Sequence, residues 1–186
     1  MVHATTKGYR VRSALFFLLF SLMVGHTYAQ RVAVKTNALG WLTASPNLEA
    51  EFVLGSHVSF DMSVMANPIS TNKFKTTFTH FQPEVRYWLN RPMVSHFVGL
   101  TTFVNNYNLM FNDVHRKGDA WGAGLTYGYA WVLGEHWNIE ATAGLGVLRY
   151  RQFKYDKGMP KPDAINDKKT VLAPVKLGIS FAYIIR

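Results

Sequence analysis

Eight charged side chains occupy the polar positions of stretches in which polar and apolar residues alternate. Because alternate residues of a strand point to opposite faces, these groups are expected to share one face of a sheet. The set combines five acids with three bases: Lys35, Glu49, Glu51, Asp61, Glu84, Arg86, Glu140 and Lys176. Isolated buried charges are costly, so inside a closed structure these groups must pair. The favoured interpretation is a salt-bridged plug, and the alternative is a narrow pore or a proton or ion relay.

Histidines supply the other candidate chemistry. His80 and His115 fall near strand ends, where a lipid A-modifying barrel enzyme would hold a catalytic side chain. Neither histidine has a Ser and an acid at a spacing that indicates a catalytic motif. His57, His96 and His136 lie beside short turns of three separate hairpins, which does not match a metal-binding motif. We therefore predict no enzyme activity, catalytic residue, metal or cofactor. The lipid A-modifying enzyme remains an alternative.

The elements that position these groups are clearest in the stretch from Trp121 to Tyr150. Two long alternating runs flank a tight break at Gly134, Glu135 and His136. One face of each run carries bulky apolar residues, and the other carries mainly Gly, Ala and Thr. A solvated face of a soluble protein normally carries many Lys and Glu, whereas small side chains suit the interior of a narrow closed barrel.

The bulky face is therefore expected to point outward, where it needs lipid. Aromatic residues near the run ends and on the same face of the last strand are predicted to form a membrane-interface girdle: Trp121, Trp131, Trp137 and Tyr183. A soluble periplasmic barrel remains an alternative. In that case the bulky face would form the core, and the protein would bind an apolar ligand.

Similar alternation predicts eight strands along the chain. We place them at 31–42, 47–54, 57–66, 77–89, 95–110, on the two runs of 121–150, and at 170–186. The fold class is thus all-β, an eight-stranded antiparallel up-and-down transmembrane β-barrel. Short turns are expected at Gly55, Asn90 and Gly134, and longer external loops at 67–76, 112–119 and 156–169. Pro83 predicts a bulge or local break. The facing of the strand at 95–110 stays open, because both of its faces are apolar.

The N-terminus indicates export. A basic lead (Lys7, Arg10, Arg12) precedes an apolar run, and Ala29 ends a small-residue cleavage site. This predicts a signal peptide at 1–29 and one barrel domain at 30–186, in a bacterial outer membrane. The formal net charge is +9 and the chain has no cysteine. For an exported basic chain, the phosphates of outer-membrane lipid and lipopolysaccharide are expected partners, and nucleic acid is not.

Four stretches together resemble a family of uncharacterised outer-membrane proteins from Bacteroides-type bacteria. They are KTNALGWLTASPNLEAEF at Lys35–Phe52, QPEVRYWL at Gln82–Leu89, YGYAWVLGEHWNIEATAGLG at Tyr127–Gly146 and PVKLGISFAYIIR at Pro174–Arg186. The resemblance implies a small barrel with no established activity. It also implies a link to surface or fimbrial proteins, because some family members are encoded near such components.

Overall fold

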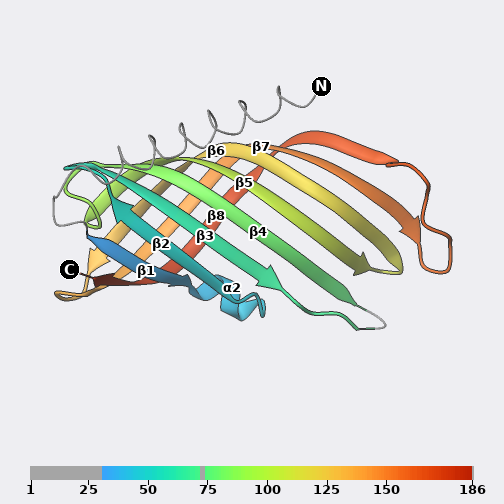
Figure 1. Cartoon of the computed structure of the whole chain (residues 1–186), viewed down its shortest axis with the longest axis horizontal. Helices are drawn as coiled ribbons and strands as arrows, with labels where there is room; N and C mark the ends of the chain where they lie inside the picture. The colour runs from blue at the N-terminus through green and yellow to red at the C-terminus, as the bar shows by residue number, and fades with distance from the viewer. Residues whose placement is uncertain (1–30, 72–73, 186) are drawn as a thin grey trace, which may run out of the picture. The chain divides into compact units, whose positions relative to one another are not determined.

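Antiparallel strands form a closed barrel in this computed structural model, which describes residues 31–71 and 74–185. Within those ranges, eight strands follow one another around the ring, and β1 pairs with β8 to close it (Figure 1). Their bounds are β1 Val32–Asn37, β2 Asn47–Val53, β3 Val58–Asn67, β4 Lys75–Trp88, β5 Ser95–Phe111, β6 Val114–Val132, β7 Trp137–Asp156 and β8 Asp167–Ile185. The predicted all-β, up-and-down arrangement is confirmed. The predicted signal peptide lies outside the described residues.

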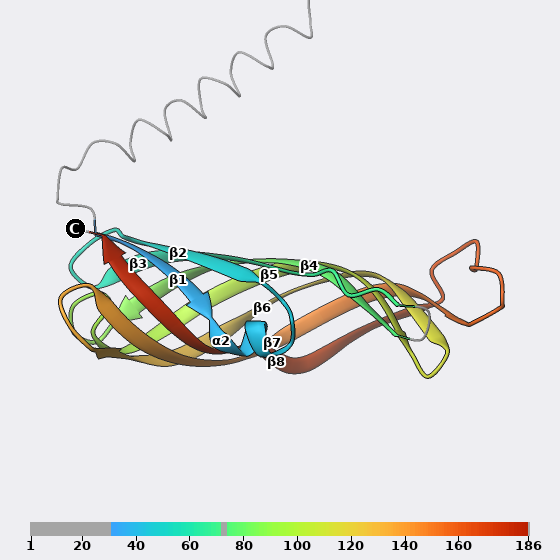
Figure 2. The same cartoon turned by 90° about the horizontal axis from the view of Figure 1, so that it is seen from below.

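The two ends of the barrel differ. At the turn end, short connections at 54–57, 89–94 and 133–136 lie beside the start of β1 and the end of β8. The opposite end, here called the loop end, carries the helix α2 (Ala38–Leu42), residues 68–71 after β3, a tight turn at 112–113 and the loop 157–166. Strands β5 to β8 have 17 to 20 residues, against 6 and 7 for β1 and β2. They therefore extend beyond α2 at the loop end (Figures 1 and 2).

Two sequence predictions at the loop end were wrong. The first strand was expected to reach Leu42, but it ends at Asn37, whose side chain accepts a hydrogen bond from the Leu39 N–H and caps α2. The segment 112–119 was expected to be a loop, but β6 begins at Val114. Asn112 and Asp113 alone make the turn, with φ of 48° and 60°. Two consecutive residues of positive φ are typical of the tight hairpin turn that suits the twist of paired strands.

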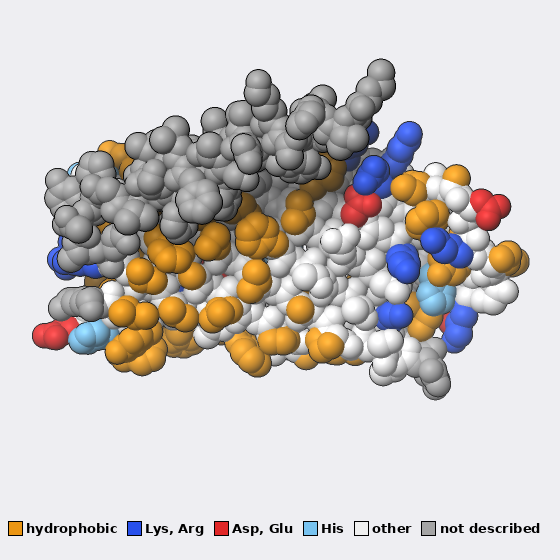
Figure 3. Space-filling model, in the orientation of Figure 1, with side chains coloured by type: hydrophobic (Ala, Val, Ile, Leu, Met, Phe, Trp, Pro, Cys, Tyr) orange, Lys and Arg blue, Asp and Glu red, His pale blue; other side chains and the backbone are white. Residues whose placement is uncertain are grey.

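Alternation directs bulky residues outward from every strand. Half-exposed or exposed apolar side chains on the outer face include Val34, Leu48, Val64, Val85, Leu100, Leu125, Leu145 and Leu177. Four of them, Val85, Leu100, Leu125 and Leu145, are direct cross-strand neighbours. In the space-filling view, apolar side chains are spread along the barrel wall, and Lys and Arg gather toward the loop end (Figure 3).

The structure also gives the facing of β5. Phe97 and Phe103 are buried inside the barrel, whereas Val98 and Leu100 are exposed. Near Pro83 the pairing between β4 and β5 is interrupted from Gln82 to Pro83 without a change of register. The break there is thus local, and the Thr101 hydroxyl donates to the Pro83 carbonyl at 3.0 Å. Among the described residues, no helix is long and apolar enough to cross a membrane.

Candidate functional site

Three carboxylates are placed side by side inside the barrel by the strand register. Glu51 on β2 is opposite Asp61 on β3, and Asp61 is opposite Glu84 on β4. All three are at most 1% exposed. Like charges directly opposite one another destabilise a sheet, so this row requires cations close by.

Three cations meet that requirement. The Arg86 guanidinium lies 3.1 Å from Glu51, 3.7 Å from Asp61, 3.3 Å from Glu84 and 3.0 Å from Glu140. The Lys35 ammonium lies 2.6 Å from Glu51, 2.7 Å from Asp61 and 3.3 Å from Glu140. Lys176 contributes contacts of 2.5 Å to Glu84 and 3.6 Å to Asp61. These seven residues form what we call the ion network.

Neutral groups add hydrogen bonds to three of the four carboxylates of the network, whereas Asp61 has only its ion pairs among the described residues. The hydroxyls of Ser59, Thr126 and Thr142 donate to Glu51, Glu84 and Glu140 respectively, the latter two at 2.5 and 3.0 Å. Trp88 donates from its indole to the Ser59 oxygen at 2.7 Å. Buried ions are retained only when such additional hydrogen bonds are present, because each has lost its hydration.

Apolar side chains fill the lumen between the ion network and the turn end. The Phe97 ring packs against Trp88 and lies 4.5 Å from the Arg86 guanidinium carbon. Nearer the turn end, Met93 packs with Ala33 and Ile184, and the Met93 carbonyl accepts a hydrogen bond from Asn138 at 2.6 Å. Together with the ion network, these layers fill the turn-end part of the lumen with side chains.

Glu49 belongs to the predicted charge set but not to the ion network. Its side chain is inside the barrel, and the residue is only 3% exposed. The Ser180 hydroxyl lies 3.4 Å from one carboxylate oxygen, and the other oxygen has no hydrogen-bond partner among the described residues. In the described chain, no cation lies within 4.0 Å of it, because Lys35 and Lys176 contact other acids.

The lumen is hollow on the loop-end side of the ion network. A lower cavity of about 260 Å³ is lined by Glu49, Lys176, His80 and several amide side chains. An upper cavity of about 300 Å³ adjoins it, and Phe78 and Asn105 line both.

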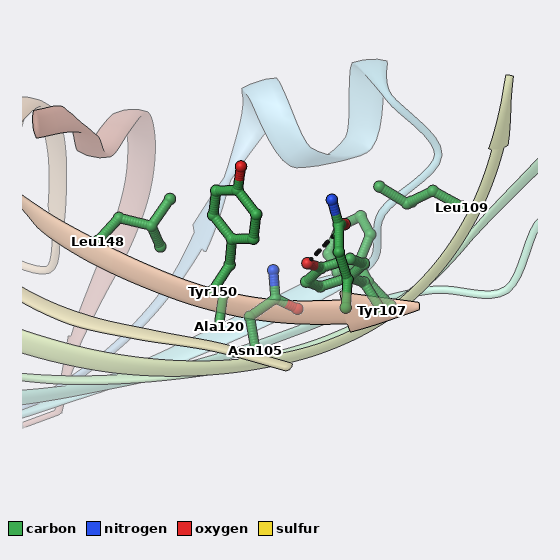
Figure 4. Close-up of a pocket in the computed structure, with 8 residues that line it drawn as sticks. Asn105, Tyr107, Leu109, Ala120, Leu148 and Tyr150 are labelled. Carbon is green, nitrogen blue, oxygen red and sulfur yellow. Dashed lines mark hydrogen bonds between the residues drawn. The ribbon is translucent and has the colours of Figure 1, made fainter. Parts of the chain in front are cut away.

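Long strands form the wall of the upper cavity. Figure 4 shows Asn105, Tyr107, Leu148 and Tyr150 directed toward this space from β5 and β7. The Tyr107 hydroxyl donates a hydrogen bond to Gln152 at 3.0 Å. The upper cavity thus has an aromatic wall, with the hydrogen-bonded Tyr107 hydroxyl and Gln152 side chain at one edge.

The histidines considered in the sequence do not converge. His80 is inside the barrel and contacts Gln82 at 3.3 Å, whereas His115 stacks on Tyr155. His57, His96 and His136 stack on Tyr87, Tyr127 and Tyr183 of separate strands, with ring centroids 5.7 to 5.9 Å apart. In the described part of the chain, no group of three or more His, Cys, Asp or Glu side chains is arranged to hold a metal ion.

The four aromatic residues predicted at the membrane interface are all outward and 42 to 54% exposed. Trp131 packs on Tyr129 and Trp137 packs on Tyr183, near the turn end. Trp121 lies toward the loop end of β6, opposite Arg149 on β7. Three of the four therefore lie toward the turn end of the outer apolar surface, and Trp121 alone lies toward its loop end.

The cavity walls were missed by sequence reasoning. Tyr107, Tyr150 and Gln152 alternate correctly, but their strands continue past the apolar outer surface. There the outer face is polar and the inner face mixes aromatic with polar side chains, so the alternation of hydrophobicity fades. A hairpin signal was present in the Asn112–Asp113 pair.

The comparisons with known proteins give a family and no activity. The family described as "Protein of unknown function (DUF3575)" matches residues 14–185. The search of curated proteins gives no match.

Proposed function

The chain belongs to the DUF3575 family of unknown function, and we propose that it is a small integral outer-membrane barrel with a plugged lumen and a structural or surface-interaction role. One observation carries the proposal: large apolar side chains from all eight strands face outward, while the lumen holds a buried ion network. A soluble barrel would have these two surfaces exchanged, because buried ions are costly and exposed apolar patches aggregate.

The height of the outer surface supports a membrane location. At about 3.3 Å per residue and a strand tilt of about 40°, the segment from Trp121 to Trp131 rises by roughly 25 Å. The apolar band of outer-membrane barrels is also about 25 Å tall and is flanked by aromatic girdles. Basic side chains begin at the level of Trp121, which lies opposite Arg149, and continue toward the loop end with Lys117, where lipopolysaccharide phosphates would meet them.

The filled lumen favours a structural or binding role over conduction. Met93 and Trp88 occupy the lumen on the turn-end side of the ion network. The part of the protein offered to partners is then the extension of β5 to β8, and the resemblance of the sequence to proteins encoded beside fimbrial components suggests a surface protein as the partner.

Cell fractionation and bilayer recording test this function. The protein is expected to stay with outer membranes after a high-salt wash, to need detergent for release, and to migrate differently on gels before and after boiling. In planar bilayers the purified barrel is expected to show no stable conductance. Release without detergent would support the soluble alternative, and a changed lipid A mass spectrum in a deletion strain would support the enzyme.

A charge on the outer surface gives a sharper test. Leu125→Arg places a guanidinium in the middle of the apolar surface, which costs about 2–4 kcal/mol if that surface faces lipid. The matched control is Met159→Arg in the loop 157–166, where the side chain is exposed. Unfolding midpoints in lipid vesicles should fall for Leu125→Arg alone. If Leu125 faced water, both variants would stay within about 0.5 kcal/mol of the parent.

A further inference from the structure

A buried carboxylate with no cation within 4.0 Å in the described chain borders the cavity of this barrel, and Lys176, which lines the same cavity, is paired with Glu84 instead. Glu49 lines the lower cavity, is 3% exposed, and has one oxygen with no hydrogen-bond partner among the described residues. Removing a carboxylate from water is expensive unless a cation or hydrogen-bond donors replace the lost hydration. The arrangement therefore favours a positively charged donor in the cavity.

A second acceptor faces the same space. The Asn105 side-chain oxygen is buried and has no partner in the described chain, and Asn105 lines both cavities. Neither Glu49 nor Asn105 is used by the ion network. Two unused acceptors at one cavity complement a ligand group that carries several N–H donors.

The surroundings favour an organic cation over a metal ion. Calcium takes six to eight oxygen ligands and commonly several carboxylates, whereas Glu51, Asp61 and Glu84 are already paired with Arg86, Lys35 and Lys176. An ammonium group needs only a few acceptors. Toward the loop end, the walls become aromatic at Phe78, Tyr107 and Tyr150, which suits an apolar body or a cation–π contact.

We propose that the cavity binds a small protonated primary amine, with its ammonium on Glu49 and Asn105 and its apolar body toward Tyr107 and Tyr150 (Figure 4). Adjoining volumes of about 260 and 300 Å³ accept an amine of this kind without displacing the ion network. The ligand enters from the loop end, since the lumen is filled toward the turn end.

Calorimetric titration of the refolded protein in detergent micelles tests the proposal, with n-pentylammonium and its neutral isostere 1-pentanol as probes. The amine is expected to bind and the alcohol to bind far more weakly. Glu49→Gln keeps the side-chain shape and removes the charge, so amine affinity should fall roughly 30-fold or more. The matched control is Glu135→Gln, an exposed carboxylate in the turn 133–136, which should leave affinity unchanged.

Equal affinity of the parent and Glu49→Gln would overturn the proposal, as would equal binding of amine and alcohol or no binding at millimolar amine. Gel mobility before and after boiling reports whether each variant has folded. If Glu49→Gln does not fold, the same titration is made with Asn105→Leu, which removes the second acceptor and leaves the ion network intact. Amine affinity should fall in that variant too. Binding in micelles does not depend on where the barrel resides, so this result is separable from the proposed membrane location.

Discussion

At the scale of single residues, Arg86 holds the most interactions of any lumen side chain described here. Its guanidinium contacts four carboxylates and lies over the Phe97 ring, and the residue is fully buried. The carboxylates of β2, β3 and β4 are direct neighbours in the register, and Arg86 is the one cation of the described chain that contacts all three of them, alongside the narrower contacts of Lys35 and Lys176.

Arg86→Met is therefore expected to lower the free energy of unfolding by about 3–5 kcal/mol, because it leaves buried acids without their counter-ion. Guanidinium titration followed by tryptophan fluorescence measures the loss. Arg151→Met is the control, since Arg151 forms a solvent-exposed pair with Asp119 worth at most about 1 kcal/mol. Similar shifts for both variants would show that the ion network contributes little.

Residue parity assigns all eight charges to one face of their strands, which is the inner face of the barrel, but it does not indicate how they are grouped. Lys35 and Glu140 are far apart in sequence and meet at 3.3 Å only because the ring closes through β8. Glu49 is left outside the ion network because the Lys176 side chain extends to Glu84 instead. Such details follow from side-chain lengths across the lumen, for which the sequence gives no direct signal.

At the scale of elements, the glycines of β6 and the phenylalanines of β5 form one packing unit. Phe97 is opposite Gly128, and Phe103 is opposite Gly122. A Cβ atom at Gly128 would overlap the Phe97 ring, and one at Gly122 would lie 2.7 Å from the Phe103 ring. The absence of side chains on β6 is thus what allows large rings to turn inward from β5.

Gly128→Ala should consequently destabilise the barrel by about 1–3 kcal/mol, as expected when a methyl group is added to a filled interior. Gly134→Ala, in the turn between β6 and β7, is the matched change at an open site, where a Cβ would meet nothing within 4 Å. Thermal unfolding of both variants in micelles checks the expectation. An unaltered midpoint for Gly128→Ala would mean that Phe97 moves at no cost.

This coupling also explains why the facing of β5 could not be predicted from its own residues. Phe97 and Leu100 are both large and apolar, and only the space left by a neighbouring strand decides which turns inward. The helix α2 was missed for a related reason, because the apolar run Ala38–Leu42 continues the composition of β1 and its one distinct signal is the capping Asn37. By contrast, β6 and β7 were predicted well across the outer apolar surface, where alternation is strict.

At the scale of the whole molecule, the two ends of the barrel are built for different surroundings. The turn end is compact, and its histidine–tyrosine stacks lie beside short connections. The loop end extends well past α2 and holds the cavities and the loop 157–166 (Figure 2). Outer-membrane barrels place short turns in the periplasm and larger structures outside the cell, so this asymmetry predicts one orientation.

The absence of cysteine from the chain makes that orientation measurable with single introduced thiols. Met159→Cys lies in the loop 157–166 and Glu135→Cys in the turn 133–136, and both native residues are exposed. A membrane-impermeant maleimide applied to intact cells should label Met159→Cys, whereas Glu135→Cys should react only after the outer membrane is permeabilised. The reverse pattern would place the cavity mouth in the periplasm, and labelling of both thiols in intact cells would argue against a membrane-spanning barrel. The expected pattern would instead present the aromatic cavity to the outside of the cell, where an amine ligand or a surface protein reaches it without crossing the membrane.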